Sequence, residues 1–300
     1  MTKHFIDFDN LSFEVLQYII DRAIVLKKDH NEGVINNSLK NKTLAMIFDK
    51  SSTRTRVSFE AGMTQLGGHA LFLSNNDIQL GRGEPIIDSA IVISSMVDAV
   101  MLRISSHEDI VTFSNYSNKP VINALSDMSH PCQILADLMT FQEQKGSING
   151  KKVAWIGDGN NVCQTYMQAA EIFGFELTIA SPKGYEPNQS FVESYQNNIN
   201  YCSSSMDACE VADLVVTDVW TSMGKESEYK QRESAFKGYQ VDEKMMSAAK
   251  RVALFMHCLP AHRGGEVSAD VIDGKQSVVW DEAENRLHTL KALMLYLIEA

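Results

Sequence analysis

Residues 43–68 read TLAMIFDKSSTRTRVSFEAGMTQLGG, and their pattern predicts a strand followed by a helix. The run TLAMIF (43–48) is apolar and has the length of a buried strand. Apolar side chains then recur at helical spacing, at Phe59, Met63 and Leu66, until a glycine pair ends the pattern. The hydroxyl-rich segment between them therefore becomes the N-terminus of a helix. A strand that leads into such a helix is the repeating unit of a parallel α/β sheet.

Similar apolar runs alternate with helical stretches along the whole chain. They are 43–48, 70–73, 99–104 and 120–125 in a first series, and 152–157, 177–181, 213–220, 252–259 and 277–280 in a second. An amphipathic helix over 11–27 opens the chain behind Ser12, a candidate N-cap. The fold class we expect is therefore α/β, with two similar-sized domains that are each a parallel sheet flanked by helices.

The break between the two series predicts the domain boundary. It lies in a helix near 134–145, so we place the first domain at 1–135 and the second at 136–285. The apolar spacing of a closing helix over 286–300 indicates that the C-terminal segment returns to the first domain. A chain of 300 residues is also longer than one hydrophobic core ordinarily supports.

Composition excludes several classes of function. The chain has 27 basic and 38 acidic residues, a net charge of −11 that argues against nucleic acid or anionic membrane as a partner. No apolar run reaches the roughly 18 residues of a membrane span, and MTKHFIDFDN lacks the apolar centre of a signal peptide, so we expect a cytoplasmic protein. Five cysteines without CxxC spacing indicate reduced thiols, with neither a disulfide framework nor a zinc ribbon.

The hydroxyl-rich helix start is a candidate phosphate site. Free N–H groups, the positive end of the helix dipole and the guanidinium of Arg54 would converge there with the neighbouring hydroxyls. The hydroxyls belong to Ser52, Thr53 and Thr55. Ligands of open α/β sheets bind beyond the carboxyl ends of the strands, and this segment follows such an end. On composition alone, an ordinary N-cap beside a surface arginine is the alternative.

Two motifs resemble signatures of the aspartate and ornithine carbamoyltransferase family. Ser52-Thr53-Arg54-Thr55 is similar to the family's carbamoyl phosphate signature. His130-Pro131-Cys132-Gln133, which follows the strand 120–125, is similar to its second signature, and Arg103 matches its arginine on carbamoyl phosphate. The resemblance covers nearly the whole chain in order, so it implies an enzyme that transfers a carbamoyl group.

These residues suit the attack of an amine on a carbonyl. The carbonyl oxygen gains negative charge, which a donor such as His130 or Arg103 can stabilise. The side-chain oxygen of Gln133 can accept a hydrogen bond from the carbamoyl NH2 group. Taken alone, a histidine is more often structural than catalytic. We expect Arg54, Arg103, His130 and Cys258 to be the catalytic residues.

Two further contacts to carbamoyl phosphate are implied by the resemblance. Gln79 fits the family glutamine that reaches the ligand from a neighbouring subunit, which implies a homo-oligomer, typically a trimer. Arg286, at the start of the closing helix, fits an arginine of the carbamoyl phosphate pocket. By composition, the loop 79–85 is only a mobile connection, and 282–288 is a charged helix start.

The second series of strands carries motifs for the other substrate. Asp218, followed by Ser222 and Met223, resembles the family's ornithine-binding loop, in which the aspartate and the serine hold the α-ammonium. Asn161 matches the family asparagine that binds the α-carboxylate. By itself, a carboxylate at a strand end is as often only solvated.

The segment HCLP (257–260) resembles the family's ornithine signature. In that signature the cysteine lies close to the bound amino acid and neighbouring carbonyls face the carbamoyl NH2, which assigns Cys258 and Leu259 to the site. The histidines and the cysteine of 257–262 match no common zinc spacing, so we expect no metal and no organic cofactor.

The resemblance implies carbamoyl transfer from carbamoyl phosphate to the δ-amine of ornithine, which yields citrulline and phosphate. The alternatives are transfer to putrescine or an N-acylornithine, a nicotinamide-dependent oxidoreductase, and a non-catalytic binding protein. GDGNN (157–161) begins like a dinucleotide fingerprint, but Val162 stands in the place of its third glycine. Gly265, Ser89 and Leu290 depart from the usual family pattern, and none of them removes a proposed ligand. The sequence does not distinguish synthesis of citrulline from its breakdown.

Overall fold

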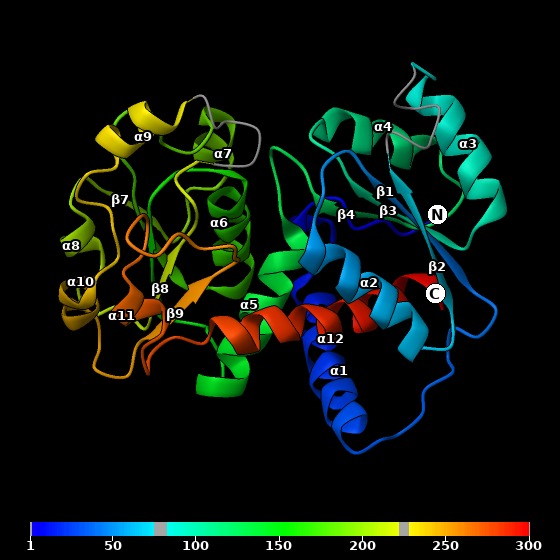
Figure 1. Cartoon of the computed structure of the whole chain (residues 1–300), viewed down its shortest axis with the longest axis horizontal. Coiled ribbons are helices and arrows are strands. Elements are labelled where there is room, and N and C mark those ends of the chain that lie inside the picture. Colours follow the sequence, from blue (N-terminus) through cyan, green and yellow to red (C-terminus); the bar gives the residue numbers. More distant parts are fainter. Residues whose placement is uncertain (1, 75–82, 222–227, 300) are drawn as a thin grey trace. The chain divides into compact units, whose positions relative to one another are not determined.

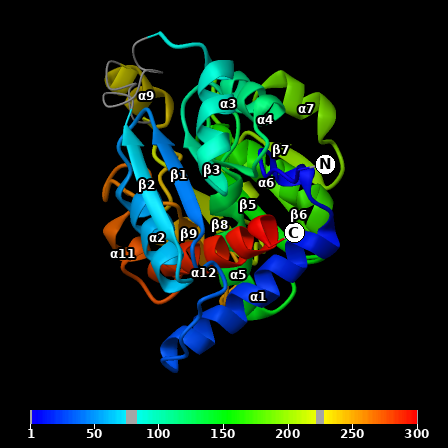
Figure 2. The same cartoon turned by 90° about the vertical axis from the view of Figure 1, so that its right-hand side faces the viewer.

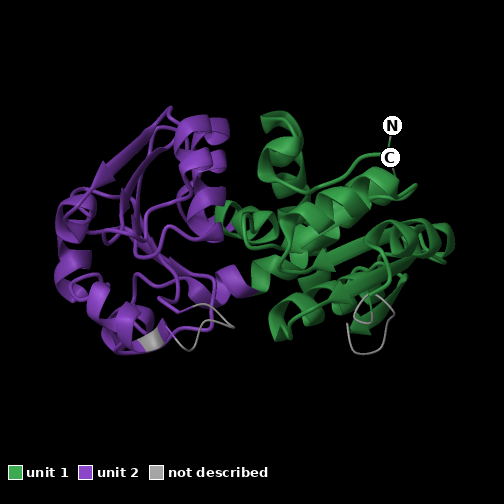
Figure 3. Ribbon diagram, turned by 90° about the horizontal axis from the view of Figure 1, so that it is seen from above, with its two compact units in different colours: residues 1–139, 284–300 green, residues 140–283 purple. Residues whose placement is uncertain are grey.

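A computed structural model of the protein describes residues 2–74, 83–221 and 228–299. The chain divides into two compact units, shown in Figure 3. Unit 1 contains Met1–Met139 and Glu284–Ala300, and unit 2 contains Thr140–Ala283. Within the described residues, no helix is long and apolar enough to cross a membrane.

Unit 1 is built on a four-stranded parallel sheet in the order β2-β1-β3-β4. The strands are β1 (Thr43–Phe48), β2 (His69–Ser74), β3 (Ala99–Arg103) and β4 (Val121–Leu125). Each was predicted from an apolar run, because parallel strands covered on both faces need apolar side chains on both. The expected parallel sheet of the first series is confirmed.

Helices cover both faces of this sheet (Figures 1 and 2). Ala45, Ile47, Val100 and Leu102 belong to a buried cluster with residues of α3 and α4. On the other face lie α1, α2 and α12 (Figure 1). The helices of unit 1 are η1 (Phe8–Asn10), α1 (Phe13–Asn31), α2 (Thr53–Gln65), α3 (Ile86–Met96) and α4 (His107–Tyr116), together with parts of α5 (Pro131–Lys145) and α12 (Val279–Ile298).

The helices α2 and α12 pack closely at Gly62. A Cβ atom added at Gly62 of α2 would lie 3.1 Å from Met294 Cε and 3.4 Å from Lys291 Cγ, both in α12. Nearer the start of α12, Arg286 also reaches α2, where it donates to Thr55.

Unit 2 contains a five-stranded parallel sheet in the order β7-β6-β5-β8-β9. The strands are β5 (Lys152–Ile156), β6 (Glu176–Ala180), β7 (Ile199–Cys202), β8 (Leu214–Thr217) and β9 (Leu254–His257). The helices are α6 (Asn161–Phe173), α7 (Gln189–Ser194), α8 (Ser205–Ala208), α9 (Tyr229–Ala235), α10 (Glu243–Ala248) and α11 (Ala269–Ile272). A buried cluster joins Ile156, Val215 and Phe255 of three neighbouring strands to side chains of α8, α10 and α11.

The structure corrects the sequence prediction at two strands. The predicted strand 277–280 is wrong, because Ser277 forms only an isolated bridge to Phe255 and the apolar run continues into α12, which begins at Val279. The strand β7 was missed. It lies at the edge of the sheet and is only partly buried, so it lacks the continuous apolar run of a central strand.

A buried histidine faces α1 from α12. His288 is fully buried, and neither of its ring nitrogens has a hydrogen-bond partner among the described residues. Its Nε2 lies 3.8 Å from Glu284 Oε1, and its ring lies 5.8 Å from the ring of His30. Burial, reinforced by the charges of Lys291, Lys27 and His30, lowers the pKa of His288 to about 3.

Stability should therefore fall in mild acid. The unfolded chain takes up a proton on His288 near pH 6.5 and the folded chain does not, so the free energy of unfolding decreases as the pH falls below that value. In the variant His288→Leu, the free energy of unfolding should fall less steeply with decreasing pH, by up to about 1.4 kcal/mol per pH unit. Urea unfolding at about pH 7.5 and pH 5 measures it. His107, whose pKa the hydrogen bond with Asp7 raises, is present in both proteins, so its contribution cancels in the comparison. If the variant and the parent lost the same free energy of unfolding between the two pH values, the prediction would be contradicted.

Candidate functional site

The start of α2 carries the predicted phosphate-binding residues of unit 1. It follows β1, and Ser52 is the N-cap, whose Oγ accepts a hydrogen bond from the Thr55 N–H at 3.4 Å. Thr55 is fully buried, Arg54 is half-buried and Thr53 is exposed. The positive end of the α2 dipole therefore lies at this hydroxyl-rich segment, where it favours an anion.

Two arginines from distant parts of the chain meet at Thr55. Arg103, at the end of β3, donates from Nη1 to Thr55 Oγ1 at 3.1 Å. Arg286 of α12 donates from Nη2 to the same oxygen, also at 3.1 Å. A threonine hydroxyl has two acceptor lone pairs, so both contacts can form at once. One neutral oxygen thus holds two positive charges at the helix start.

Gln133 is fixed on α5 between a cation and an anion. Its Oε1 accepts from Arg286 Nη1 at 2.9 Å, and its Nε2 donates to Asp137 Oδ1, also at 2.9 Å. The oxygen that we expected to face a carbamoyl NH2 group therefore also orients Arg286. Asp137 is buried and was not found by sequence reasoning, although it lies four residues after Gln133 on the same helix, the spacing at which two helical side chains meet.

His130 is buried in the same part of unit 1. Burial, together with the positive charges of Arg286, Arg103 and Arg54, holds its pKa well below the usual value. The imidazole is therefore neutral at pH 7 and can donate a hydrogen bond without adding charge. The structure thus brings His130 close to the arginines that the sequence placed at 54, 103 and 286.

Cys132, beside His130, has a structural role. Burial raises the pKa of its thiol to about 12, although Arg286 and Arg103 act in the opposite direction. Its Sγ donates to the backbone oxygen of Asn123 at 3.3 Å. A protonated, buried thiol is a poor nucleophile.

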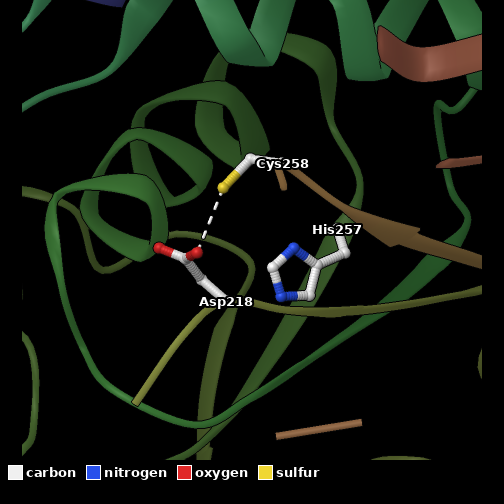
Figure 4. Close-up of side chains that lie close together, drawn as sticks. All are labelled: Asp218, His257 and Cys258. Carbon is white, nitrogen blue, oxygen red and sulfur yellow. Dashed lines mark hydrogen bonds between the residues drawn. The ribbon is translucent and has the colours of Figure 1, made fainter. Parts of the chain in front are cut away.

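Asp218 is the centre of the second group of site residues, in unit 2 (Figure 4). It follows β8 and is nearly buried. Its Oδ1 accepts from the Val219 N–H at 2.7 Å and from Cys258 Sγ at 3.1 Å. Its Oδ2 accepts from Asn160 Nδ2 at 2.7 Å. The structure therefore joins the predicted Asp218 and Cys258, and adds Asn160, the neighbour of the predicted Asn161.

The turn before α6 differs from a dinucleotide-binding turn. A Cβ atom at Gly159 would lie 2.2 Å from the backbone nitrogen of Pro187, because the segment of Glu186 and Pro187 passes directly over this residue. In a dinucleotide fingerprint the second glycine lets the pyrophosphate approach the backbone at this place. The space is filled here, which argues against the oxidoreductase alternative.

Both ring nitrogens of His257, and its backbone N–H, form hydrogen bonds. Its Nδ1 accepts from the Leu259 N–H at 2.9 Å, so Nε2 carries the proton and donates to Glu266 Oε1 at 3.1 Å. Glu282 Oε2 accepts from the His257 N–H at 3.0 Å. Leu259 has a left-handed backbone with φ 57°, a conformation that few branched residues adopt, and the Leu259-Pro260 peptide bond is cis.

Glu266 was not found by sequence reasoning. Burial would raise the pKa of its carboxyl group, but hydrogen bonds from His257 and from the His262 N–H lower it below its usual value. The charged carboxylate thus fixes the tautomer of His257. The signal that could have found Glu266 is its position shortly after the HCLP segment, where a buried acid can reach back to the histidine.

Asp218, His257 and Cys258 could resemble a metal site, since their ligand atoms lie within 4.8 Å of one another (Figure 4). Both nitrogens of His257 are, however, engaged with Leu259 and Glu266. A metal would have to displace one of these bonds. The geometry fits hydrogen bonding better than metal ligation.

Arg232, in α9, was also missed. It donates from Nη1 to Asp158 Oδ2 at 2.6 Å and to the Trp220 backbone oxygen at 2.7 Å, and from Nε to Glu228 Oε2 at 2.9 Å. One buried side chain thus connects the turn before α6 with the segment after β8. Gln79, Ser222 and Met223, which the sequence assigned to the site, lie outside the described residues.

Comparison with known proteins places the chain in a family. Residues 3–143 match the carbamoyl-P binding domain of aspartate/ornithine carbamoyltransferase, and residues 149–297 match its Asp/Orn binding domain. The chain therefore belongs to the aspartate/ornithine carbamoyltransferase family.

Its relatives point to one branch of that family. A protein of Ruthia magnifica subsp. Calyptogena magnifica named ornithine carbamoyltransferase is 65% identical over 298 residues, which cover 99% of this chain and 100% of the relative. The crystal structure of ornithine carbamoyltransferase from Burkholderia thailandensis E264 has a TM-score of 0.92 at 50% identity, over 99% of this chain and 98% of that one. The enzyme from Pyrococcus furiosus has a TM-score of 0.94 at 46% identity, over 98% and 96%.

Proposed function

We propose that this chain transfers the carbamoyl group of carbamoyl phosphate to the δ-amine of L-ornithine, giving L-citrulline and phosphate. The observation that carries the proposal is the convergence of Arg103 and Arg286 on the Thr55 hydroxyl at the start of α2. Cations gathered at a helix N-terminus suit a phosphate group. Relatives named ornithine carbamoyltransferase, matched over nearly the full chain, support ornithine as the acceptor.

Carbamoyl phosphate binds at the start of α2. The helix N–H groups and the guanidinium of Arg54 hold the phosphate, each charge-assisted hydrogen bond contributing roughly 1.5–3 kcal/mol. Arg286 adds positive charge and keeps Gln133 in place. The full set of proposed contacts is Ser52, Thr53, Arg54, Thr55, Gln79, Arg103, His130, Gln133, Cys258, Leu259 and Arg286.

The neutral δ-amine then attacks the carbamoyl carbon. A C–N bond forms, the C–O bond to phosphate breaks, and phosphate leaves with the electron pair of that bond. The amine proton passes to a phosphate oxygen, so the step balances without a cofactor. Neutral His130 and Arg103 donate to the carbonyl oxygen as it gains charge. One such donor typically contributes about 2.7–4 kcal/mol to transition-state stabilisation.

Ornithine is selected by the residues around Asp218. The Asp218 carboxylate accepts the α-ammonium, Asn161 donates to the α-carboxylate, and Ser222 and Met223 complete the contact. Putrescine has no carboxylate for Asn161, and an N-acylornithine has no α-ammonium for Asp218. Both alternatives are therefore disfavoured.

Most of the rate enhancement comes from positioning. Orientation of two bound reactants contributes roughly 7–11 kcal/mol, and the proposed step asks for no covalent enzyme intermediate. Cys258 remains a thiol that donates to Asp218, which suits a contact to the bound amino acid better than nucleophilic attack. The backbone oxygen of Leu259 would accept from the carbamoyl NH2.

Gln79 is proposed to act in a neighbouring subunit, so the working enzyme is a homotrimer. Such an assembly would place the glutamine of one subunit on the carbamoyl phosphate of another. A cytoplasmic location, as expected from the sequence, is part of the same proposal.

Loss of Arg54 tests the phosphate site. We expect Arg54→Ala to lower kcat/KM for carbamoyl phosphate at least about 100-fold, because charge-assisted bonds to phosphate are lost. The matched control is Arg56→Ala on the same helix, because Arg56 pairs with Glu60. This substitution should change the activity by no more than a few fold. A citrulline assay measures both. Ordinary activity of Arg54→Ala would refute the assignment.

Loss of the charge at Asp218 tests the ornithine site. Asp218→Asn keeps the shape of the side chain and should raise the KM for ornithine at least about tenfold, with the KM for carbamoyl phosphate changed less than about twofold. Asp213→Asn is the matched control, since Asp213 precedes the same strand and pairs with Lys250. Equal losses for the two substrates would count against the role of Asp218.

The oligomeric state tests the role of Gln79. Sedimentation equilibrium should give three times the chain mass of 33.5 kDa at assay concentrations. A fully active protein with the mass of a single chain would exclude a contribution from a neighbouring subunit.

A further inference from the structure

Asn160 uses both ends of its side-chain amide. Its Oδ1 accepts from the N–H groups of Val162 and Cys163, at 3.0 and 3.2 Å, and so caps α6. Its Nδ2 donates to Asp218 Oδ2 at 2.7 Å. A flipped amide would turn the NH2 group toward two N–H donors and the oxygen toward a carboxylate, so only one orientation is favourable. The helix cap therefore dictates that a donor faces Asp218.

Asp218 is held on several sides by groups that are themselves fixed. Its other oxygen accepts from the Val219 N–H and from Cys258 Sγ. A carboxylate offers about four acceptor positions, so these described contacts leave room for one further donor. The side chain is nearly buried, and its orientation decides where that last acceptor position points.

We infer that Asn160 is a positioning residue that gives the enzyme its selectivity for a substrate with a free α-ammonium, by holding the carboxylate of Asp218 in the orientation that accepts it. The inference rests on the proposed role of Asp218 in binding ornithine. Asn160 acts through Asp218 and not by touching the substrate, in contrast to the proposed role of its neighbour Asn161.

A serine at this position separates the two functions of Asn160. Serine caps a helix about as well as asparagine, so Asn160→Ser should keep α6 intact while it removes the donor to Asp218. The matched control is Asn188→Ser, because Asn188 caps α7 in the same unit through Ser190 and has no described contact with Asp218. Melting temperatures of both variants report on the fold.

Steady-state kinetics with two ligands test the inference. We expect Asn160→Ser to raise the KM for ornithine about tenfold, with kcat and the KM for carbamoyl phosphate within about twofold. The inhibition constant of 5-aminovalerate, which has the carboxylate and the terminal amine but no α-ammonium, should stay unchanged. Equal weakening of ornithine and 5-aminovalerate would mean a general structural effect and would overturn the inference. Asn188→Ser should match the parent for both ligands.

A double-mutant cycle provides the second readout. In the Asp218→Asn background, Asn160→Ser should cause almost no further rise in the KM for ornithine, because its effect passes through the Asp218 carboxylate. If the KM increases of the two single variants multiplied in the double variant, the two residues would act separately and the inference would be overturned. A parent protein that forms no citrulline would overturn the proposed function as well. An active parent with parent-like kinetics in Asn160→Ser would overturn the inference alone.

Discussion

The arrangement of the candidate site residues in unit 1 depends on the hydrogen bonds that the Thr55 hydroxyl accepts from two arginines. This hydroxyl lies at the first turn of α2 and accepts hydrogen bonds from Arg103 of β3 and Arg286 of α12, so one buried oxygen connects three elements. The same contact gathers positive charge in a chain whose net charge is −11. Burial lowers the pKa of His130 most, and the local positive charge lowers it further, because a further cation beside the arginines would be repelled. The side chains that connect these three elements are thus also the ones that we propose to bind the anion.

The candidate site residues of unit 2 centre on a negative charge, the carboxylate of Asp218, whereas those of unit 1 centre on positive charges. The surrounding donors are a backbone N–H, the amide of Asn160 and the thiol of Cys258, none of which carries a charge. A cation can therefore still be attracted to the carboxylate, whereas an arginine in the same place would have neutralised it. A second buried carboxylate, that of Glu266, accepts from His257 Nε2 and so fixes the tautomer of the imidazole. His257 Nδ1 can therefore accept from the Leu259 N–H and hold that backbone.

Sequence reasoning succeeded where the signal is local. The helix start at Ser52 and all four strands of the first sheet follow from apolar spacing and hydroxyl content. Arg286 was placed only through a family resemblance, because its partner Thr55 lies 231 residues away. Asn160 and Arg232 were missed because their partners Asp218 and Asp158 lie 58 and 74 residues away in the sequence. Glu266 was missed although it lies only nine residues after His257. The prediction at 277–280 failed because a short apolar run fits a strand and the start of a buried helix equally well.

The backbone of Glu186 and Pro187 over Gly159 limits what unit 2 could become. A doubly wound sheet with a glycine-containing turn after its first strand is a common starting point for binding nucleotides. A glycine at position 162 would not be enough to create a dinucleotide site here. The backbone of Glu186 and Pro187 already occupies the place that the pyrophosphate would take. Redesign for such a ligand would have to shorten or reroute the connection between β6 and α7. A small change in the path of one loop thus separates two ligand chemistries on the same architecture.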